Sequence, residues 1–145
     1  MAGLPATRKS WKNIGFDKPK YIEVNVAISP EQFEVIKQGL IPEEMEDKWF
    51  IYYARGIIHF HRSWTGREIY RAKIQKGTDG YSLNGFHVEA NQEIWRCPSD
   101  EENIAYFIGV FTNVLFPFHA RTFNPGERRI LELMVSAPDF FRTES

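Results

Sequence analysis

The segment KWFIYYARGIIHFHRSWTGREIYRAKI, residues 48–74, decides the fold. Two runs of aromatic and β-branched residues, 48–54 and 57–63, are separated by the dipeptide Arg55-Gly56. Such runs are typical of strands, and a two-residue separation predicts a tight β-hairpin. A third run of this kind begins at Arg67. The segment therefore predicts three consecutive antiparallel strands.

The lengths of the two turns determine which side chains share a face of this sheet. A three-residue second turn, Trp64-Thr65-Gly66, places Tyr70 opposite Phe60 and keeps the apolar residues together. It also sets Arg62 opposite Glu68, and the two carry opposite charges. The core face predicted in this way carries Trp49, Ile51, Tyr53, Ile58, Phe60, Tyr70, Ala72 and Ile74.

The opposite face of the predicted sheet gathers cationic and imidazole groups on an aromatic background. From Arg55 to Lys76 the sequence has six Lys or Arg residues and one acidic residue. We call this surface the histidine face. Its predicted members are Phe50, Tyr52, His59, His61, Ser63, Arg67, Arg71 and Lys73, with His87 and Glu89 joining from a later strand.

Strand and helix signals flank the central segment on both sides. Alternation over residues 21–28 predicts a half-buried strand, and Ser29-Pro30-Glu31-Gln32 predicts a capped helix that ends near Gly39. Beyond the central segment the sequence predicts a strand over 81–90 with a bulge at Asn84-Gly85, a helix over 100–115 and a last helix from Asn124 through Met134. This order predicts an α+β fold, an antiparallel β-meander of about four to five strands with helices packed on one face.

Length and composition predict one domain, residues 21–140, preceded by a flexible N-terminal arm, residues 1–20. The formal net charge of −1 argues against a nucleic-acid partner. The most apolar run, residues 104–118, is too short to cross a bilayer, so no membrane association is expected. A single cysteine, Cys97, allows no intramolecular disulfide and favours a reducing, cytoplasmic location.

The histidine face combines groups that suit recognition of phosphate. The predicted ligand-binding residues are Arg67, Arg71, Tyr52, Ser63 and His87, with the arginines on phosphate and Tyr52 stacking on a base. His61 or His59 is the predicted acid or base, because imidazole titrates near neutral pH. The sequence predicts no metal site and no cofactor. A solvated sheet face also carries polar and cationic residues, and this alternative stays open.

Two stretches of the central segment resemble a motif in small uncharacterised bacterial proteins. They are MEDKWFIY, residues 45–52, and HFHRSWTG, residues 59–66, followed by Ile69-Tyr70. Some of those proteins carry ADP-ribosylglycohydrolase-like labels, and the resemblance covers residues 24–116. It implies an ADP-ribose-like ligand. The acidic clusters of ADP-ribosylglycohydrolases and the glycine-rich diphosphate loop of macrodomains have no counterpart in this sequence.

The leading hypothesis is therefore a phosphate-bearing nucleotide, such as ADP-ribose, bound at the histidine face. Hydrolysis or transfer of that ligand extends the hypothesis, and the sequence leaves open whether the protein is an enzyme. The alternative is a non-catalytic protein-interaction module. It would use Phe50 and Tyr52, or the apolar C-terminal helices, to bind a partner or a second copy in a homodimer.

Overall fold

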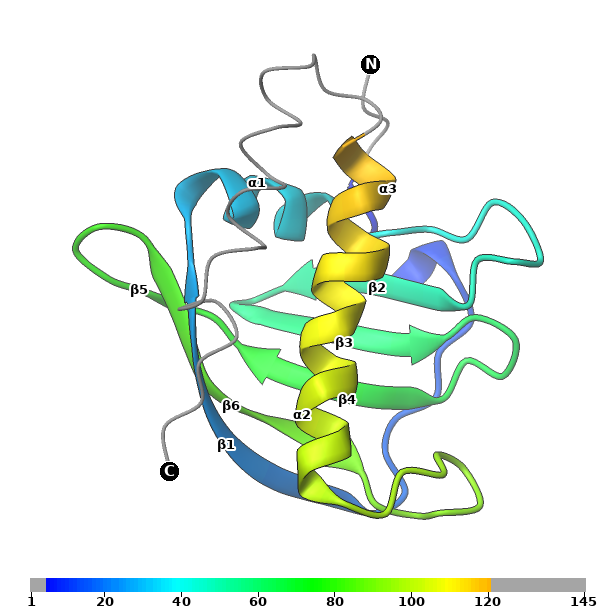
Figure 1. Ribbon diagram of the computed structural model, residues 1–145. Helices are drawn as coiled ribbons and strands as arrows, with labels where there is room; N and C mark the ends of the chain where they lie inside the picture. Colours follow the sequence, from blue (N-terminus) through cyan, green and yellow to red (C-terminus); the bar gives the residue numbers. More distant parts are fainter. Residues whose placement is uncertain (1–4, 121–145) are drawn as a thin grey trace.

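The computed structural model describes residues 5–120, which form an antiparallel sheet crossed on one face by a long helical rod (Figure 1). The strands are β1 (Pro19–Ile28), β2 (Trp49–Ala54), β3 (Ile57–Arg62), β4 (Glu68–Lys73), β5 (Gln75–Lys76) and β6 (Tyr81–Glu89). The helices are the 3-10 helix η1 (Arg8–Ser10), α1 (Pro30–Gln38), α2 (Asp100–Gly109), the π-helix η2 (Val110–Leu115) and α3 (Phe116–Ala120). The predicted helix from Asn124 through Met134 lies outside the described residues.

The strand order is β1-β6-β4-β3-β2, with the short β5 paired to β6. The prediction of an α+β fold with a meander-like antiparallel sheet is confirmed, and β5 brings the strand number to six. Every pairing is antiparallel. No helix in the described part of the chain has the length and apolar character that crossing a bilayer requires.

The helix after β1 begins and ends where the sequence predicts. Ser29 Oγ accepts a hydrogen bond from the backbone N–H of Gln32, and the Gln32 side chain accepts one from the N–H of Ser29. The chain then turns at Gly39, which has φ 67°. A Cβ at this position would lie 2.3 Å from the carbonyl oxygen of Ile51, so only glycine permits the close approach to β2.

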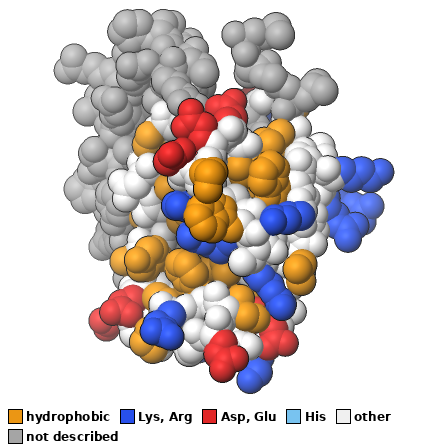
Figure 2. Space-filling model, turned by 90° about the vertical axis from the view of Figure 1, so that its right-hand side faces the viewer, with side chains coloured by type: hydrophobic (Ala, Val, Ile, Leu, Met, Phe, Trp, Pro, Cys, Tyr) orange, Lys and Arg blue, Asp and Glu red, His pale blue; other side chains and the backbone are white. Residues whose placement is uncertain are grey.

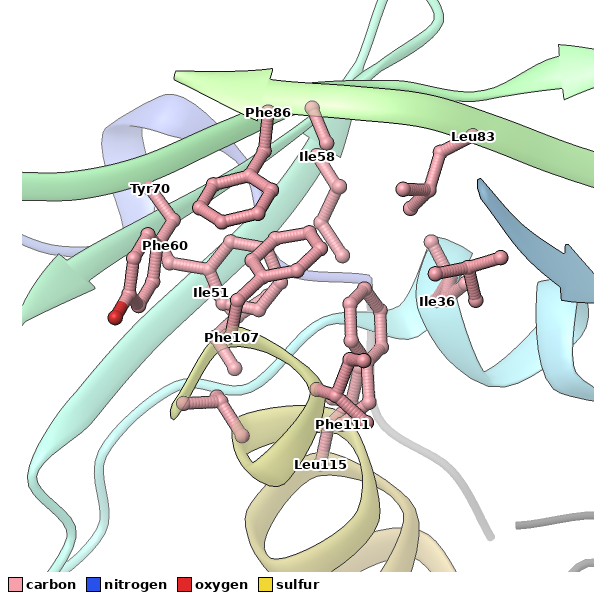
Figure 3. Close-up of a cluster of buried hydrophobic side chains, with 14 of the residues drawn as sticks. Ile36, Ile51, Ile58, Phe60, Tyr70, Leu83, Phe86, Phe107, Phe111 and Leu115 are labelled. Atoms are coloured by element: carbon pink, nitrogen blue, oxygen red, sulfur yellow. The ribbon is translucent and has the colours of Figure 1, made fainter. Parts of the chain in front are cut away.

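The core lies between the sheet and the helical rod (Figure 3). Phe107 of α2 stacks on Phe86 of β6, with ring centroids 4.1 Å apart, and meets Phe60 and Tyr70 edge to face. Seven of the eight predicted core-face residues are buried, and the eighth, Tyr53, is half-buried. Aromatic rings thus supply much of the apolar area that a small domain needs.

The register between β3 and β4 differs from the prediction at one point. Phe60 pairs with Tyr70 as expected, but His61, and not Arg62, pairs with Glu68. The predicted Arg62–Glu68 pair is therefore wrong. An extra residue in β4, Ile69, forms a bulge at this point and its side chain enters the core, where it is fully buried. Burial of an isoleucine contributes about 2 kcal/mol, which offsets the interrupted ladder.

The predicted bulge at Asn84-Gly85 is also misplaced. The additional residue lies in β1, between Glu23 and Val26, opposite this part of β6. Gly85 has a different role, because a Cβ there would lie 2.2 Å from the phenolic oxygen of Tyr21. The glycine leaves room for the Tyr21 ring to cross β6.

The helical rod changes its winding before Pro117. The predicted helix over 100–115 comprises α2 and the π-helix η2, and the rod continues through α3. Proline has no N–H to donate to the carbonyl four residues earlier, and its ring clashes with that carbonyl. The wider turn of η2 accommodates this misfit, and π-helical segments of this kind often lie at functional sites.

The described part of the N-terminal arm, residues 5–18, packs behind the sheet, on the face opposite the helical rod (Figure 1). Ala6 N–H donates to the carbonyl of Gln38, and Ile14 forms a β-bridge with Arg67. The indole N–H of Trp11 donates to the carbonyl of Ser63 over 2.7 Å. These contacts place the arm against the histidine face, while its flexibility stays a prediction.

Candidate functional site

The aromatic part of the histidine face is closed in the structure. Phe50 is fully buried and Tyr52 is 5% exposed, because they form a second, smaller apolar cluster with Ala6 of the arm. Trp11 and Ile41 pack against the same cluster. The surface that the sequence predicts as an open stacking platform is therefore an interior layer between the sheet and the arm.

Glu68 organises the charged groups of this face. Its carboxylate accepts hydrogen bonds from Nε and Nη2 of Arg71, at 3.1 and 2.5 Å, and lies 2.6 Å from Nδ1 of His59. Burial opposes ionisation of Glu68, but these hydrogen bonds outweigh it and hold the pKa of the carboxyl below its usual value. The hydrogen bond with Glu68 likewise raises the pKa of Arg71. The phosphate-binding cation predicted at Arg71 is thus already paired with an internal anion.

His61 lies beside this network as a buried, neutral ring. Burial lowers its pKa to about 4, so it carries no charge at neutral pH. Its ring stacks on Tyr52 with centroids 5.7 Å apart, and its Nδ1 has no hydrogen-bond partner among the described residues. His59 also stacks on Tyr52, at 4.5 Å. Of the two predicted acid–base residues, only His59 has a carboxylate that orients it.

The remaining predicted ligand-binding residues have other partners. Ser63 Oγ donates to the carbonyl of Asp47 over 2.7 Å, which makes it part of a loop anchor. His87 is exposed, pairs with Arg71 across the strands and packs against the ring of Tyr21. Arg67 forms the bridge to the arm through its backbone. The structure brings Tyr52, His59, His61 and Arg71 together, with His87 beside Arg71 at the surface, while Ser63 contacts the strap and Arg67 pairs with the arm.

A different arginine, Arg62, has the environment expected of a ligand-binding cation. Its guanidinium carbon lies 4.9 Å from the ring centre of Trp49 and 5.8 Å from that of Trp95. The side chain is half-buried, and burial lowers its pKa. Within residues 5–120, no carboxylate forms an ion pair with it and no acceptor takes a hydrogen bond from its side chain.

Arg62 opens into a cavity of about 430 Å³, which we call the Arg62 cavity. One wall comes from the helical rod at η2 and α3, and another from the loop that leads into β2. The lining residues are Leu40, Glu46, Asp47, Lys48, Trp49, Arg62, Asn113, Val114, Pro117 and Phe118. A half-buried cation, an aromatic wall and a polar amide therefore meet in one hollow.

The loop beside this cavity, residues 42–48, is a well-anchored strap. Asp47 Oδ2 accepts hydrogen bonds from the backbone N–H groups of Glu43 and Glu44, so this carboxylate is engaged within the strap. The indole N–H of Trp64 donates to the carbonyl of Met45 over 3.1 Å. Ser63 holds the strap at Asp47 as described above. The HFHRSWTG stretch thus fixes one wall of the Arg62 cavity.

Sequence reasoning missed Arg62 because it assigned the residue an ion-pair partner. A signal was present, since strand alternation places Arg62 opposite Trp49 on the apolar face, and this pairing is confirmed. A cation at such a position requires either a buried partner or an opening to solvent. The bulge at Ile69 removes Glu68, the partner that the sequence suggests.

Comparisons with known proteins gave no match for this chain. No family model, no curated protein and no solved structure is significantly similar to it. The resemblance in the HFHRSWTG motif is therefore supported by the motif alone.

Proposed function

We propose that this protein binds a small phosphate-bearing ligand, such as a nucleotide, in the Arg62 cavity. The observation that carries the proposal is the Arg62 guanidinium, which is half-buried, stacked on two indole rings and without an anionic partner among residues 5–120. The proposal keeps the ligand class that the sequence suggests and moves the site from the histidine face to the opposite side of β3.

Energetics favour an anionic ligand at this position. Removing a charge from water is costly unless it is paired, and the indole contacts contribute about 0.5–2 kcal/mol each in compensation. Those contacts engage no acceptor, and within the described part of the chain the side-chain N–H groups of Arg62 donate to none. The planar fork of an arginine matches two oxygen atoms of a phosphate or carboxylate. A bound oxyanion would satisfy both the charge and the donors of Arg62.

The other lining groups suit a phosphate ester that carries a planar ring. Lys48 lines the cavity, with its Nζ 4.5 Å from the centre of the Trp64 ring, and Asn113 brings an amide. Trp49, Val114 and Phe118 provide apolar and aromatic walls. The volume of about 430 Å³ lies within the range of about 300–1,000 Å³ that is usual for small-ligand sites. These features together support a nucleotide-sized ligand over a free metal ion.

The proposal is limited to binding. No described histidine lines the Arg62 cavity, and the oriented imidazole of His59 belongs to the opposite face of the sheet. The described lining thus offers carboxylates and a lysine, but no imidazole, for acid–base work on the ligand.

Isothermal titration calorimetry with inorganic phosphate, AMP and ADP-ribose tests the proposal. We expect at least one of them to bind the wild-type protein, and Arg62→Gln to weaken that binding at least tenfold. Arg62→Lys keeps the charge but loses the fork, so its binding should be intermediate. Arg55→Gln is the matched control, because Arg55 lies at the exposed β2–β3 turn, at the other end of the strands.

Circular dichroism at the titration temperature establishes that each variant is folded. Equal affinity in the wild type and Arg62→Gln would contradict the proposal. Absence of binding by all three compounds at millimolar concentration would also contradict it, because a built phosphate site should bind at least one of them.

A further inference from the structure

Three large hydrophobic side chains that a soluble domain normally buries are exposed around the β3–β4 turn. Met45 is 72% exposed, Trp64 is 59% exposed and Ile14 is 49% exposed. They come from the strap, the turn and the arm, respectively. The indole of Trp64 is hydrogen-bonded to the backbone of Met45, and Ile14 N–H donates to the carbonyl of Gly66. We call this surface the Trp64 patch.

The Trp64 patch surrounds a hollow of about 590 Å³. The lining residues are Trp11, Lys12, Pro42, Glu43, Glu44, Met45, Ser63 and Trp64. The hollow therefore has an apolar floor with a basic residue from the arm and acidic residues from the strap. Figure 2 shows a group of hydrophobic side chains at the centre of this face, with acidic side chains above it and Lys or Arg side chains beside it.

Hydrogen bonds hold the two tryptophan side chains of the Trp64 patch and its hollow in place. The Trp64 ring is held on one edge by its hydrogen bond to Met45, and Lys48 Nζ lies 4.5 Å from its centre. Trp11 is fixed by its hydrogen bond to Ser63. Gly66, with φ 78°, shapes the turn against the arm. Aromatic side chains that are already ordered lose little entropy on association and are frequent anchors of protein interfaces.

The distribution of charge indicates which partner fits. A two-fold dimer requires that the same surface be complementary to itself, so that each residue meets its counterpart in reverse order. Lys12 and Glu44 both line the hollow of the Trp64 patch, so this one surface carries the two opposite charges that such a dimer needs. Neither of them forms an ion pair with another described residue. In a two-fold arrangement, Lys12 of each copy faces Glu44 of the other.

We propose that the Trp64 patch binds a second copy of this chain and forms a two-fold dimer. Met45, Trp64 and Ile14 form its apolar centre, and Lys12 and Glu44 form its paired rim. This surface replaces Phe50 and Tyr52, which the sequence suggested for self-association and which are buried under the arm. The two sites share the strap, but the dimer proposal requires no ligand in the Arg62 cavity.

Sedimentation equilibrium of the full chain over a concentration series measures the association. We expect the mass to rise from 17.0 kDa towards twice that value. Met45→Glu places a carboxylate on the apolar floor and should weaken association at least tenfold without changing the melting temperature. Tyr21→Glu is the control, because Tyr21 is equally prominent but lies on β1 at the far edge of the sheet. A mass of 17.0 kDa at every concentration would overturn the proposal.

Exchange of charges tests the two-fold pairing itself. Lys12→Glu alone should weaken association, since it places two carboxylates against each other at both ends of the interface. Glu44→Lys alone should do the same with two ammonium groups. An equimolar mixture of the two variants restores both opposite-charge pairs, so we expect it to recover the wild-type mass. A mixture that stays monomeric, or single variants that dimerise like the wild type, would overturn the arrangement.

Discussion

Arg71 and Arg62 lie on opposite faces of the same sheet and differ in what surrounds them. Arg71 is 39% exposed and donates two hydrogen bonds to Glu68, whose side chain is 2% exposed. Arg62 is stacked on tryptophan rings, faces a cavity and has no anionic partner among the described residues. A cation that already has an internal anion supports the fold, whereas an unpaired one is available to a ligand. The number of cations on a face is therefore a poor guide to function unless their partners are known.

The largest effect on stability should follow from removing the carboxylate of Glu68, which pairs with Arg71. Glu68→Gln leaves the charge of Arg71, which is 39% exposed, and the imidazole of His59 without a carboxylate. Leaving these partly buried groups unpaired costs about 1–3 kcal/mol, because water screens the exposed part of Arg71. We expect the free energy of unfolding, measured in urea, to fall by about that amount.

Glu93→Gln is the matched control for that measurement, because Glu93 is exposed and its side chain makes no ion pair with a described residue. Its free energy of unfolding should stay within about 0.5 kcal/mol of the wild type. If Glu68→Gln were no less stable than Glu93→Gln, the network on the histidine face would have no structural role.

A pH effect of intermediate size should come from His61. Its pKa is about 4 in the folded protein and near 6.5 in the unfolded chain, so the unfolded state binds more protons between these values. The contribution of the neutral His61 ring to the free energy of unfolding is complete above pH 6.5 and is lost as the pH falls through 4. His61→Phe should therefore lose less stability than the wild type between pH 7 and pH 5, as measured by urea unfolding.

His87→Gln provides the control for this pH dependence, because His87 is exposed at the surface of β6. It should follow the wild-type curve. Glu68 acts in the same direction at lower pH, since its depressed pKa makes stability fall as the carboxylate is protonated. A His61→Phe variant with the wild-type slope between pH 5 and pH 7 would show that His61 is not a buried neutral ring.

The smallest effect on stability should come from replacing Arg62. Arg62→Gln loses two cation–π contacts but also relieves the burial of an unpaired charge, and these changes oppose each other. We expect the free energy of unfolding to change by less than about 1 kcal/mol. A loss as large as that of Glu68→Gln would show that Arg62 is a structural residue like Arg71.

The sequence was sufficient for the order of the elements and for most of the sheet register. Alternation and turn length led to the β2–β3 pairing and to the Phe60–Tyr70 pair, because each depends on residues that are close in the chain. The capping box at Ser29 is equally local. The bulge at Ile69 was not predictable in this way, since it depends on the core that receives the isoleucine.

The site was harder to predict because its parts come from distant segments. The arm covers the histidine face through Ala6 and Trp11, and nothing in its composition predicts which surface it meets. The shift of a single residue in β4 moved Glu68 from Arg62 to Arg71. Because of this shift, Arg71 has the carboxylate partner that the sequence predicted for Arg62.

The ligand that binds the wild-type protein can be titrated calorimetrically into Arg62→Gln and into Arg71→Gln. This experiment compares the two arginines directly. Both variants remove one guanidinium, and circular dichroism at the titration temperature confirms that each is folded. We expect Arg62→Gln to lose binding at least tenfold and to keep its stability. Arg71→Gln should keep the wild-type affinity and lose stability. Loss of binding in Arg71→Gln with full binding in Arg62→Gln would contradict the assignment and return the ligand site to the histidine face.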